Sequence, residues 1–127
     1  MLGISDPFHG QALLESLVEQ KMIFGAMEIF HRLGPTGHSD FSLLNAVEPG
    51  TFDLHTIGDM KIPGVSLFMR VHELADPVST FDDMIEVAQN LADDLGGELK
   101  DESRSVMTSQ TIEHCRLDIR QYQHKHR

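Results

Sequence analysis

The segment from Pro63 to Val71 carries the clearest strand pattern in the chain, because apolar and polar side chains alternate there with a period of two. Its apolar face consists of Val65, Leu67, Met69 and Val71. Its other face consists of Ser66, Phe68 and Arg70. We expect the first face to pack on a core. A single exposed ring such as Phe68 is common, so it indicates a binding surface only if neighbouring strands also direct apolar groups outward.

Further strands are predicted where short apolar runs are bounded by turn-forming residues. They lie at 1–4, 41–47, 64–71 and, at a sheet edge, 98–101. The turn formers Ser5, Asp6 and Pro7 end the first of them. Segment 22–32 is rich in β-forming residues, and Gly25 within it is consistent with two short strands joined at a kink.

Apolar residues recur at helical spacing in three segments. The first spans about 10–20, and the longest begins near a cap at Asp76 or Ser79 and ends at Gly96. Thr108 is the expected cap of the last helix. The apolar stripe of that helix consists of Ile112, Cys115, Ile119 and Tyr122. This order of elements predicts an α+β fold, with helices on one face of a mostly antiparallel sheet and the other face open.

The outward faces of the predicted strands share apolar positions. Alternation in 41–48 sets Ser42, Leu44, Ala46 and Glu48 opposite Phe41, Leu43, Asn45 and Val47. In 27–32 both faces contain apolar groups, so the pattern does not decide which one faces the core. If Met27 and Ile29 face outward, they form a shallow apolar strip with Leu44, Ala46 and Phe68. The alternatives are scattered surface residues or a contact with a second copy of the chain.

Composition narrows the classes of partner. A length of 127 residues predicts one domain with a single core. With 10 Lys plus Arg against 20 Asp plus Glu, the net charge of −10 disfavours nucleic acid and anionic membrane surfaces. The single cysteine excludes an internal disulfide and fits a reducing compartment. The chain shows neither a signal peptide nor an apolar run of about 20 residues, so we expect a soluble cytosolic domain.

The chain is poor in catalytic motifs. It contains no phosphate-binding glycine loop, dinucleotide fingerprint or nucleophile elbow. His9, His38, His55 and His72 fall in predicted turns or strand ends without a partner at ligand spacing. His124 and His126 have no third ligand nearby. Cys115 belongs to an apolar stripe and is expected to be structural. The sequence therefore predicts no enzyme, no cofactor and no metal site.

Longer segments carry a family resemblance. These are 24–32 (FGAMEIFHR), 41–53 (FSLLNAVEPGTFD), 63–69 (PGVSLFM), 91–97 (LADDLGG) and 107–110 (MTSQ). In this order they resemble the FtsZ-binding domain of the bacterial cell-division protein ZipA, over nearly the whole chain. The resemblance implies a split β-α-β fold, with about six mostly antiparallel strands, three helices on one face and an open opposite face.

The resemblance also implies a partner and a site. In that family the open face receives the C-terminal tail peptide of FtsZ, which tethers the division ring to the inner membrane from the cytoplasmic side. The family's cavity residues correspond to Met27, Ile29, Leu44, Ala46, Glu48, Ser66 and Phe68. Family members carry an N-terminal membrane anchor and a linker before this domain. We therefore expect the chain, 1–127, to be the excised domain without them.

Three positions depart from the family pattern. Ala46 stands where the family usually has methionine, so we expect a deeper and less adaptable cavity floor. Glu48 replaces a lysine and reverses the charge that the peptide meets. The first strand begins at Met1, so we expect the apolar cavity residues that it would contribute to be missing or represented only by residues 1–4.

Two other functions share the prediction of an open sheet face. An RNA-binding sheet would need a basic surface and more than one stacking ring, whereas Phe68 is alone in that role. A homodimer formed through the apolar strip remains open.

Overall fold

Six strands form one sheet in the order β2-β3-β4-β5-β1-β6, and every pairing between neighbours is antiparallel. The computed structural model describes residues 2–35, 37–101 and 103–125. The strands are β1 (Leu2–His9), β2 (Ile23–Phe24), β3 (Phe30–Leu33), β4 (Ser39–Asn45), β5 (Lys61–Phe68) and β6 (Glu98–Lys100). The predicted kink at Gly25 is confirmed, because β2 and β3 are separate strands on either side of it.

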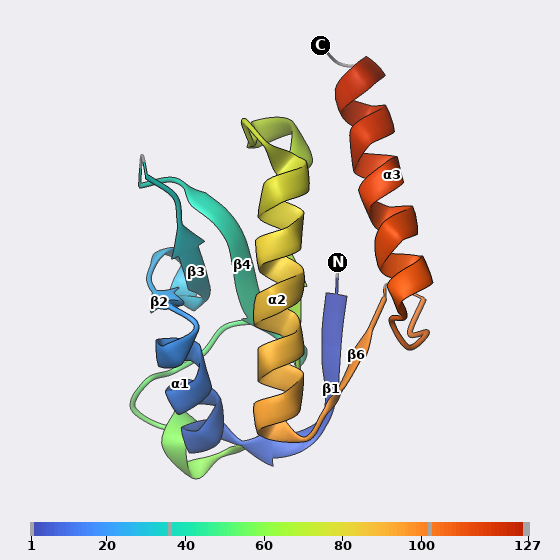
Figure 1. Cartoon of the computed structure of the whole chain (residues 1–127). Coiled ribbons are helices and arrows are strands. Elements are labelled where there is room, and N and C mark those ends of the chain that lie inside the picture. Colours follow the sequence, from blue (N-terminus) through green and yellow to red (C-terminus); the bar gives the residue numbers. More distant parts are fainter. Residues whose placement is uncertain (1, 36, 102, 126–127) are drawn as a thin grey trace.

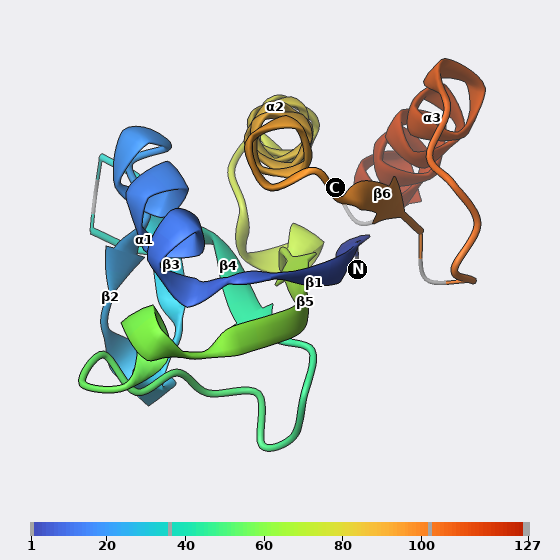
Figure 2. The ribbon, with the colours of Figure 1, turned by 90° about the horizontal axis from the view of Figure 1, so that it is seen from below.

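The helices lie on one side of this sheet. They are α1 (Gly10–Glu19), α2 (Pro77–Leu95) and α3 (Ser109–Lys125), with short 3₁₀ turns η1 (Ala26–Glu28), η2 (Ile57–Asp59) and η3 (Val71–Glu73). Figures 1 and 2 show α1 and α2 over the sheet, with α3 beyond α2 near the β6 edge. The predicted α+β fold, with helices on one face and the other face open, is therefore confirmed.

The core fills the space between the helices and the inner face of the sheet. Its fully buried side chains include Ile4, Leu13, Leu17, Phe41, Leu43, Val65, Leu67, Ala88 and Leu91. Val65 and Leu67 confirm that the apolar face of the 63–71 segment packs inward. The facing pair Leu43 and Leu67 places the inner sides of β4 and β5 against the helices.

The ends of the two long helices follow the sequence signals. The Asp76 carboxylate accepts a hydrogen bond from the backbone N–H of Ser79 at 3.1 Å, so Asp76 is the cap. Gly96 ends α2 in the left-handed conformation with φ 70°. At the start of α3 the Thr108 hydroxyl accepts from the backbone N–H of Thr111 at 3.2 Å. The buried Ile112 then anchors this helix to the core.

A charged contact joins α3 to α2. Arg116 donates to Asp82 at 2.5 Å and to Glu113 at 2.7 Å. These hydrogen bonds, the one with Asp82 first, raise the pKa of the Arg116 guanidinium above its usual value. The contact is at the surface, so we expect it to orient α3 rather than to stabilise the fold strongly.

The boundaries of β1 and β5 differ from the prediction. The first strand does not end at Ser5, because β1 continues to His9. An irregularity in register between Ser5 and Phe8 accommodates the proline, which has no N–H for the ladder. β5 begins at Lys61 and ends at Phe68, so the prediction that the strand runs to residue 71 is wrong.

Residues beyond these strand ends have other environments. Met69 still packs against the core, whereas Val71 lies in η3. Val47 was predicted on the inner face, but β4 ends at Asn45 and the Val47 side chain is exposed. Met1 of the first predicted strand and His126 lie outside the described residues.

Gly10 allows α1 to start directly against the 57–60 segment. A Cβ atom at Gly10 would lie 1.6 Å from the carbonyl oxygen of Ile57, and the Gly10 N–H donates to the carbonyl of Met60 at 2.8 Å. We expect Gly10→Ala to destabilise the fold by about 1–3 kcal/mol or more, because backbone must move to admit the methyl group. Thermal denaturation followed by circular dichroism measures this. Gly3→Ala is the matched control, since its Cβ would meet Val65 at an ordinary 3.7 Å; equal melting temperatures would contradict the prediction.

Candidate functional site

The outer face of the sheet is organised by cross-strand pairs. Residues directly opposite each other in antiparallel strands point to the same face. His31 of β3 lies opposite Ser42 of β4, which lies opposite Phe68 of β5. In the next row Leu44 lies opposite Ser66. These two rows define the surface that we call the open face.

A small hollow lies on the open face beside Phe68. Its volume is about 140 Å³. Its lining residues are Met27, Ile29, His31, Ser39, Asp40, Phe41, Ser42, Phe68, Met69, Arg70 and Glu73. We call it the open-face hollow. It therefore brings together Met27, Ile29 and Phe68 from the predicted site, although Met27 and Ile29 come from the turn before β3 and Phe68 comes from the end of β5.

The orientation of Met27 and Ile29, which the sequence pattern left open, follows from this hollow. Ile29 is only 6% exposed, yet it does not belong to the core cluster beneath the helices. Met27 is 75% exposed at the rim. Both side chains line the open-face hollow with Phe68. Three residues of the predicted apolar strip, Met27, Ile29 and Phe68, therefore lie together at this end of the open face.

The remaining predicted site residues lie outside the open-face hollow. Leu44 and Ser66 are half-buried in the neighbouring row. Ala46 follows the end of β4, where its N–H donates to the carbonyl of Gly64 at 3.0 Å. Glu48 is exposed in the turn after it. Ala46 does not line the hollow, so its small side chain does not form the floor of this hollow. That these positions together bind a partner stays a prediction.

The turn that carries Met27 has an unusual backbone. Met27 and Glu28 have φ values of 64° and 59°, and such left-handed non-glycine residues cost about 1–2 kcal/mol each. Gly25 N–H donates to the carbonyl of Ile29 at 3.0 Å, and Phe52 N–H donates to the carbonyl of Glu28 at 2.9 Å. We call residues 25–29 the Met27 turn. These bonds hold Met27 at the rim of the open-face hollow.

The imidazole of His31 connects the Met27 turn to β4. Its Nε2 lies 2.9 Å from the carbonyl oxygen of Ala26. Because a carbonyl only accepts, Nε2 carries the proton and donates. Its Nδ1 lies 2.8 Å from the hydroxyl of Ser42 and 3.1 Å from that of Ser39. Sequence reasoning did not single out His31; the available signal was its place on the same alternating face as Met27 and Ile29.

The other end of the open-face hollow is charged. Arg70 lies 3.7 Å from Glu73, and both side chains are more than half exposed. An ion pair this exposed adds little to stability. Asp40 is half-buried nearby and also lines the hollow. A ligand here would therefore meet apolar side chains at one end and charged ones at the other.

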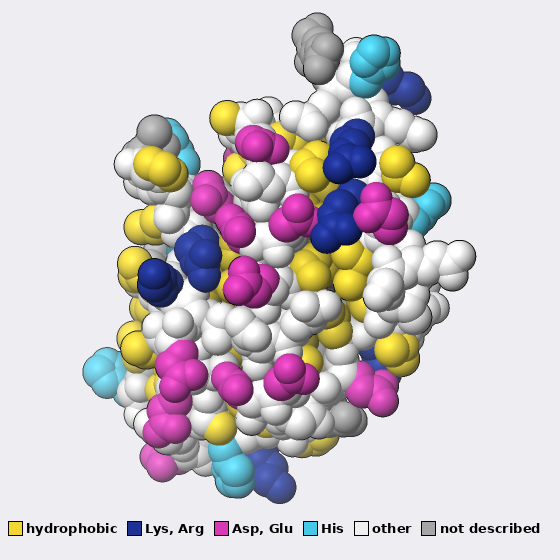
Figure 3. All heavy atoms as spheres, in the orientation of Figure 1, with side chains coloured by type: hydrophobic (Ala, Val, Ile, Leu, Met, Phe, Trp, Pro, Cys, Tyr) yellow, Lys and Arg dark blue, Asp and Glu magenta, His cyan; other side chains and the backbone are white. Residues whose placement is uncertain are grey.

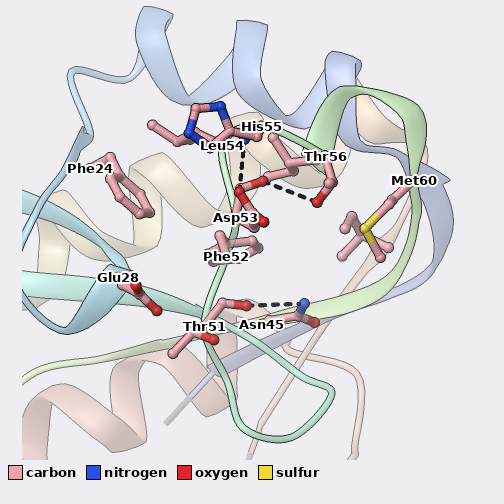
Figure 4. A pocket seen from close by; sticks show the side chains of 12 residues that line it. Phe24, Glu28, Asn45, Thr51, Phe52, Asp53, Leu54, His55, Thr56 and Met60 are labelled. Atoms are coloured by element: carbon pink, nitrogen blue, oxygen red, sulfur yellow. Dashed lines mark hydrogen bonds between the residues drawn. The ribbon is translucent and has the colours of Figure 1, made fainter.

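A larger cavity of about 610 Å³ lies under the 51–60 loop (Figure 4). Its residues are Phe24, Glu28, Asn45, Thr51, Phe52, Asp53, Leu54, His55, Thr56, Ile57, Met60 and Ile62. None of the predicted site residues lines it. Asp53 already accepts from the backbone N–H of His55 at 2.9 Å, and its carbonyl accepts from Thr56. These polar groups at the rim of the cavity are therefore already hydrogen-bonded within the loop itself.

The helix side of the molecule has a different character. Figure 3 shows acidic side chains spread over this face, with basic side chains near α3 and also at the opposite edge and the bottom of the view. In the described parts of the chain, no three His, Cys, Asp or Glu side chains gather in a way that could hold a metal ion. Among the same residues, no helix is long and apolar enough to cross a membrane.

Comparison with known proteins identifies relatives over nearly the whole chain. Residues 2–118 match the family described as ZipA, C-terminal FtsZ-binding domain. The cell division protein ZipA of Stutzerimonas stutzeri (strain A1501) is 44% identical over 121 residues, which cover 93% of this chain and 44% of that protein. ZipA of Ectopseudomonas mendocina (strain ymp) is 45% identical over 121 residues, with 93% and 44% covered.

A third relative also matches most of the chain. ZipA of Pseudomonas aeruginosa (strain UCBPP-PA14) is 47% identical over 115 residues, which cover 88% of this chain and 40% of that protein. The chain thus spans less than half the length of these relatives. With the family match over 2–118 and a sheet that has one uncovered face, the chain belongs to the family of ZipA C-terminal FtsZ-binding domains.

Proposed function

We propose that this domain binds the C-terminal tail peptide of FtsZ on its open face. In the cell this contact would tether the division ring to the inner membrane from its cytoplasmic side and support septum formation. The observation that carries the proposal is the open-face hollow, in which Met27, Ile29 and Phe68 form an apolar surface outside the core. Membership of the FtsZ-binding family supplies the identity of the partner.

The mechanism is docking of an apolar peptide face onto a preformed surface. A tail that folds into an amphipathic helix or turn would set one apolar side chain into the open-face hollow. Its neighbours would rest on Leu44 and Ala46 in the adjoining row. Glu48, at the edge, would favour a basic residue of the peptide. Burial of Phe68 under the peptide contributes on the order of 1.5–3 kcal/mol.

The affinity of a single contact should be modest. Ordering a disordered tail costs several kcal/mol of the gross interaction energy, so we expect a Kd of about micromolar. A division ring presents many tails to many anchored domains. Avidity then supplies the strength that one contact lacks, and each contact can still exchange.

The same surface argues against nucleic acid and catalysis. The net charge of −10 repels an anionic polymer, and Phe68 is the one Phe, Tyr or Trp side chain among the open-face cross-strand partners described above. The polar side chains of the open-face hollow hydrogen-bond to one another in a structural arrangement, as His31, Ser39 and Ser42 do. We therefore propose a binding module rather than an enzyme.

Titration of the domain into a fluorescently labelled FtsZ tail peptide tests the proposal. We expect saturable binding with a Kd of about micromolar, and no saturation with a scrambled peptide of the same composition. Sedimentation of the free domain should show a monomer, and labelled single-stranded RNA should not bind. Absence of saturable peptide binding up to roughly 100-fold above the expected Kd would refute the proposal. So would a stable dimer that the peptide cannot dissociate.

A further inference from the structure

We propose that His31 is a positioning residue for tail binding, because its imidazole holds the Met27 turn against the open-face hollow. The inference rests on the proposed function and adds a residue to it. His31 lines the same hollow as Met27, but its ring nitrogens are directed to protein groups. It therefore acts through Met27 rather than by offering its own nitrogens to the peptide.

The hydrogen bonds of the ring fix its orientation. Ser42 is only 4% exposed and holds Nδ1 at 2.8 Å from one side, with Ser39 at 3.1 Å. This leaves Nε2–H pointing at the carbonyl of Ala26, 2.9 Å away. The result is a continuous path from β4, through the ring on β3, to the peptide unit directly before Met27.

The turn needs such support because its backbone is not one that the residues adopt freely. Both Met27 and Glu28 lie in the left-handed region, with φ of 64° and 59°. The bond from Phe52 N–H holds the far side of the turn at the Glu28 carbonyl, and His31 holds the near side at Ala26. Without the near anchor, Met27 can relax to ordinary φ values and leave the rim of the hollow.

Loss of the hydrogen bond from His31 to Ala26 should weaken peptide binding without lowering the stability of the domain. Met27 is 75% exposed and the turn contributes no residue to the core cluster between 25 and 29. The stability of the domain should therefore depend little on where the turn rests. Support of a contact residue by buried hydrogen bonds is a general feature of pre-organised sites.

A matched pair of variants isolates the bond to Ala26. His31→Asn keeps an amide beside Ser42, but its nitrogen is too short to reach Ala26. His31→Gln is one methylene longer and places its nitrogen near the position of Nε2. We expect His31→Asn to weaken tail-peptide binding about fivefold, the equivalent of one ordinary hydrogen bond, and His31→Gln to restore binding to within about twofold of wild type.

Two further readouts separate positioning from general damage. In a Met27→Ala background, His31→Asn should weaken binding by less than about twofold, because coupled residues are non-additive. In the free domain, the methyl resonance of Met27 should shift in His31→Asn and return in His31→Gln. Ser42→Ala, which releases the ring from its other side, should weaken binding in the same Met27-dependent way if His31→Asn does not fold.

The outcomes separate this inference from the proposed function. If the wild-type domain does not bind the tail peptide, the proposed function fails and the role of His31 fails with it. If wild type binds and Phe68→Ala abolishes binding, but His31→Asn binds as wild type, only the inference about His31 is overturned. Full additivity of His31→Asn with Met27→Ala would overturn it as well.

Discussion

Replacing Phe68 with alanine should weaken binding of the FtsZ tail peptide at least about tenfold, while the melting temperature stays within a few degrees of wild type. The ring lies at the end of β5 on the open face and lines the hollow with Met27 and Ile29. It is half-buried and lies outside the core cluster. Its removal therefore takes away apolar area that the peptide would cover, and little that the fold requires.

Fluorescence anisotropy of the labelled peptide measures the loss of affinity, and calorimetry measures the melting temperature. Val18→Ala is the control for binding, because Val18 is an exposed apolar residue on α1, on the helix side. It should leave the affinity unchanged. A Phe68→Ala variant that loses folding and binding together would instead place the ring in the core and contradict its role in the open-face hollow.

Leu67→Ala should have the opposite effect. The Leu67 side chain is 0% exposed and belongs to the core cluster. Its truncation should lower the free energy of unfolding by about 2–5 kcal/mol and the melting temperature by roughly 10 °C or more. At a temperature where the variant is still folded, its affinity for the tail peptide should remain close to that of wild type, because its side chain faces the helices.

Urea denaturation gives the free energy of unfolding, and a peptide titration at low temperature gives the affinity. Leu67→Ala and Phe68→Ala serve as controls for each other, since the two residues are neighbours on one strand and face opposite sides of the sheet. A Leu67→Ala domain that is as stable as wild type but does not bind would reverse the assignment of the two faces of β5.

Much of the fold could be predicted because its signals are local. Alternation along 63–71 separated Val65 and Leu67 from Phe68, and the structure buries the first two in the core. The predicted start of β5 was wrong because the extension of this strand to Lys61 depends on pairing with the far end of β1. That part of β1 follows Ser5-Asp6-Pro7, and these three residues taken alone predict a turn. Long-range pairing outweighed local turn preference there.

The candidate site could be predicted only in part for a similar reason. The outward positions of Leu44, Ser66 and Phe68 follow from alternation alone. The Met27 turn does not, because two left-handed non-glycine residues have no sequence signal and are held by partners elsewhere in the chain. The contact between His31 and the buried Ser42 could not be predicted, because the two residues become neighbours only when β3 pairs with β4.

Backbone NMR during titration with the FtsZ tail peptide tests the central claim most directly. The account predicts that chemical-shift changes concentrate on the open face of β3, β4 and β5 and on the Met27 turn, with the largest changes around Ile29 and Phe68. Residues of α1, α2 and α3, on the other side of the sheet, should change little. Changes confined to the helices would contradict the open-face site.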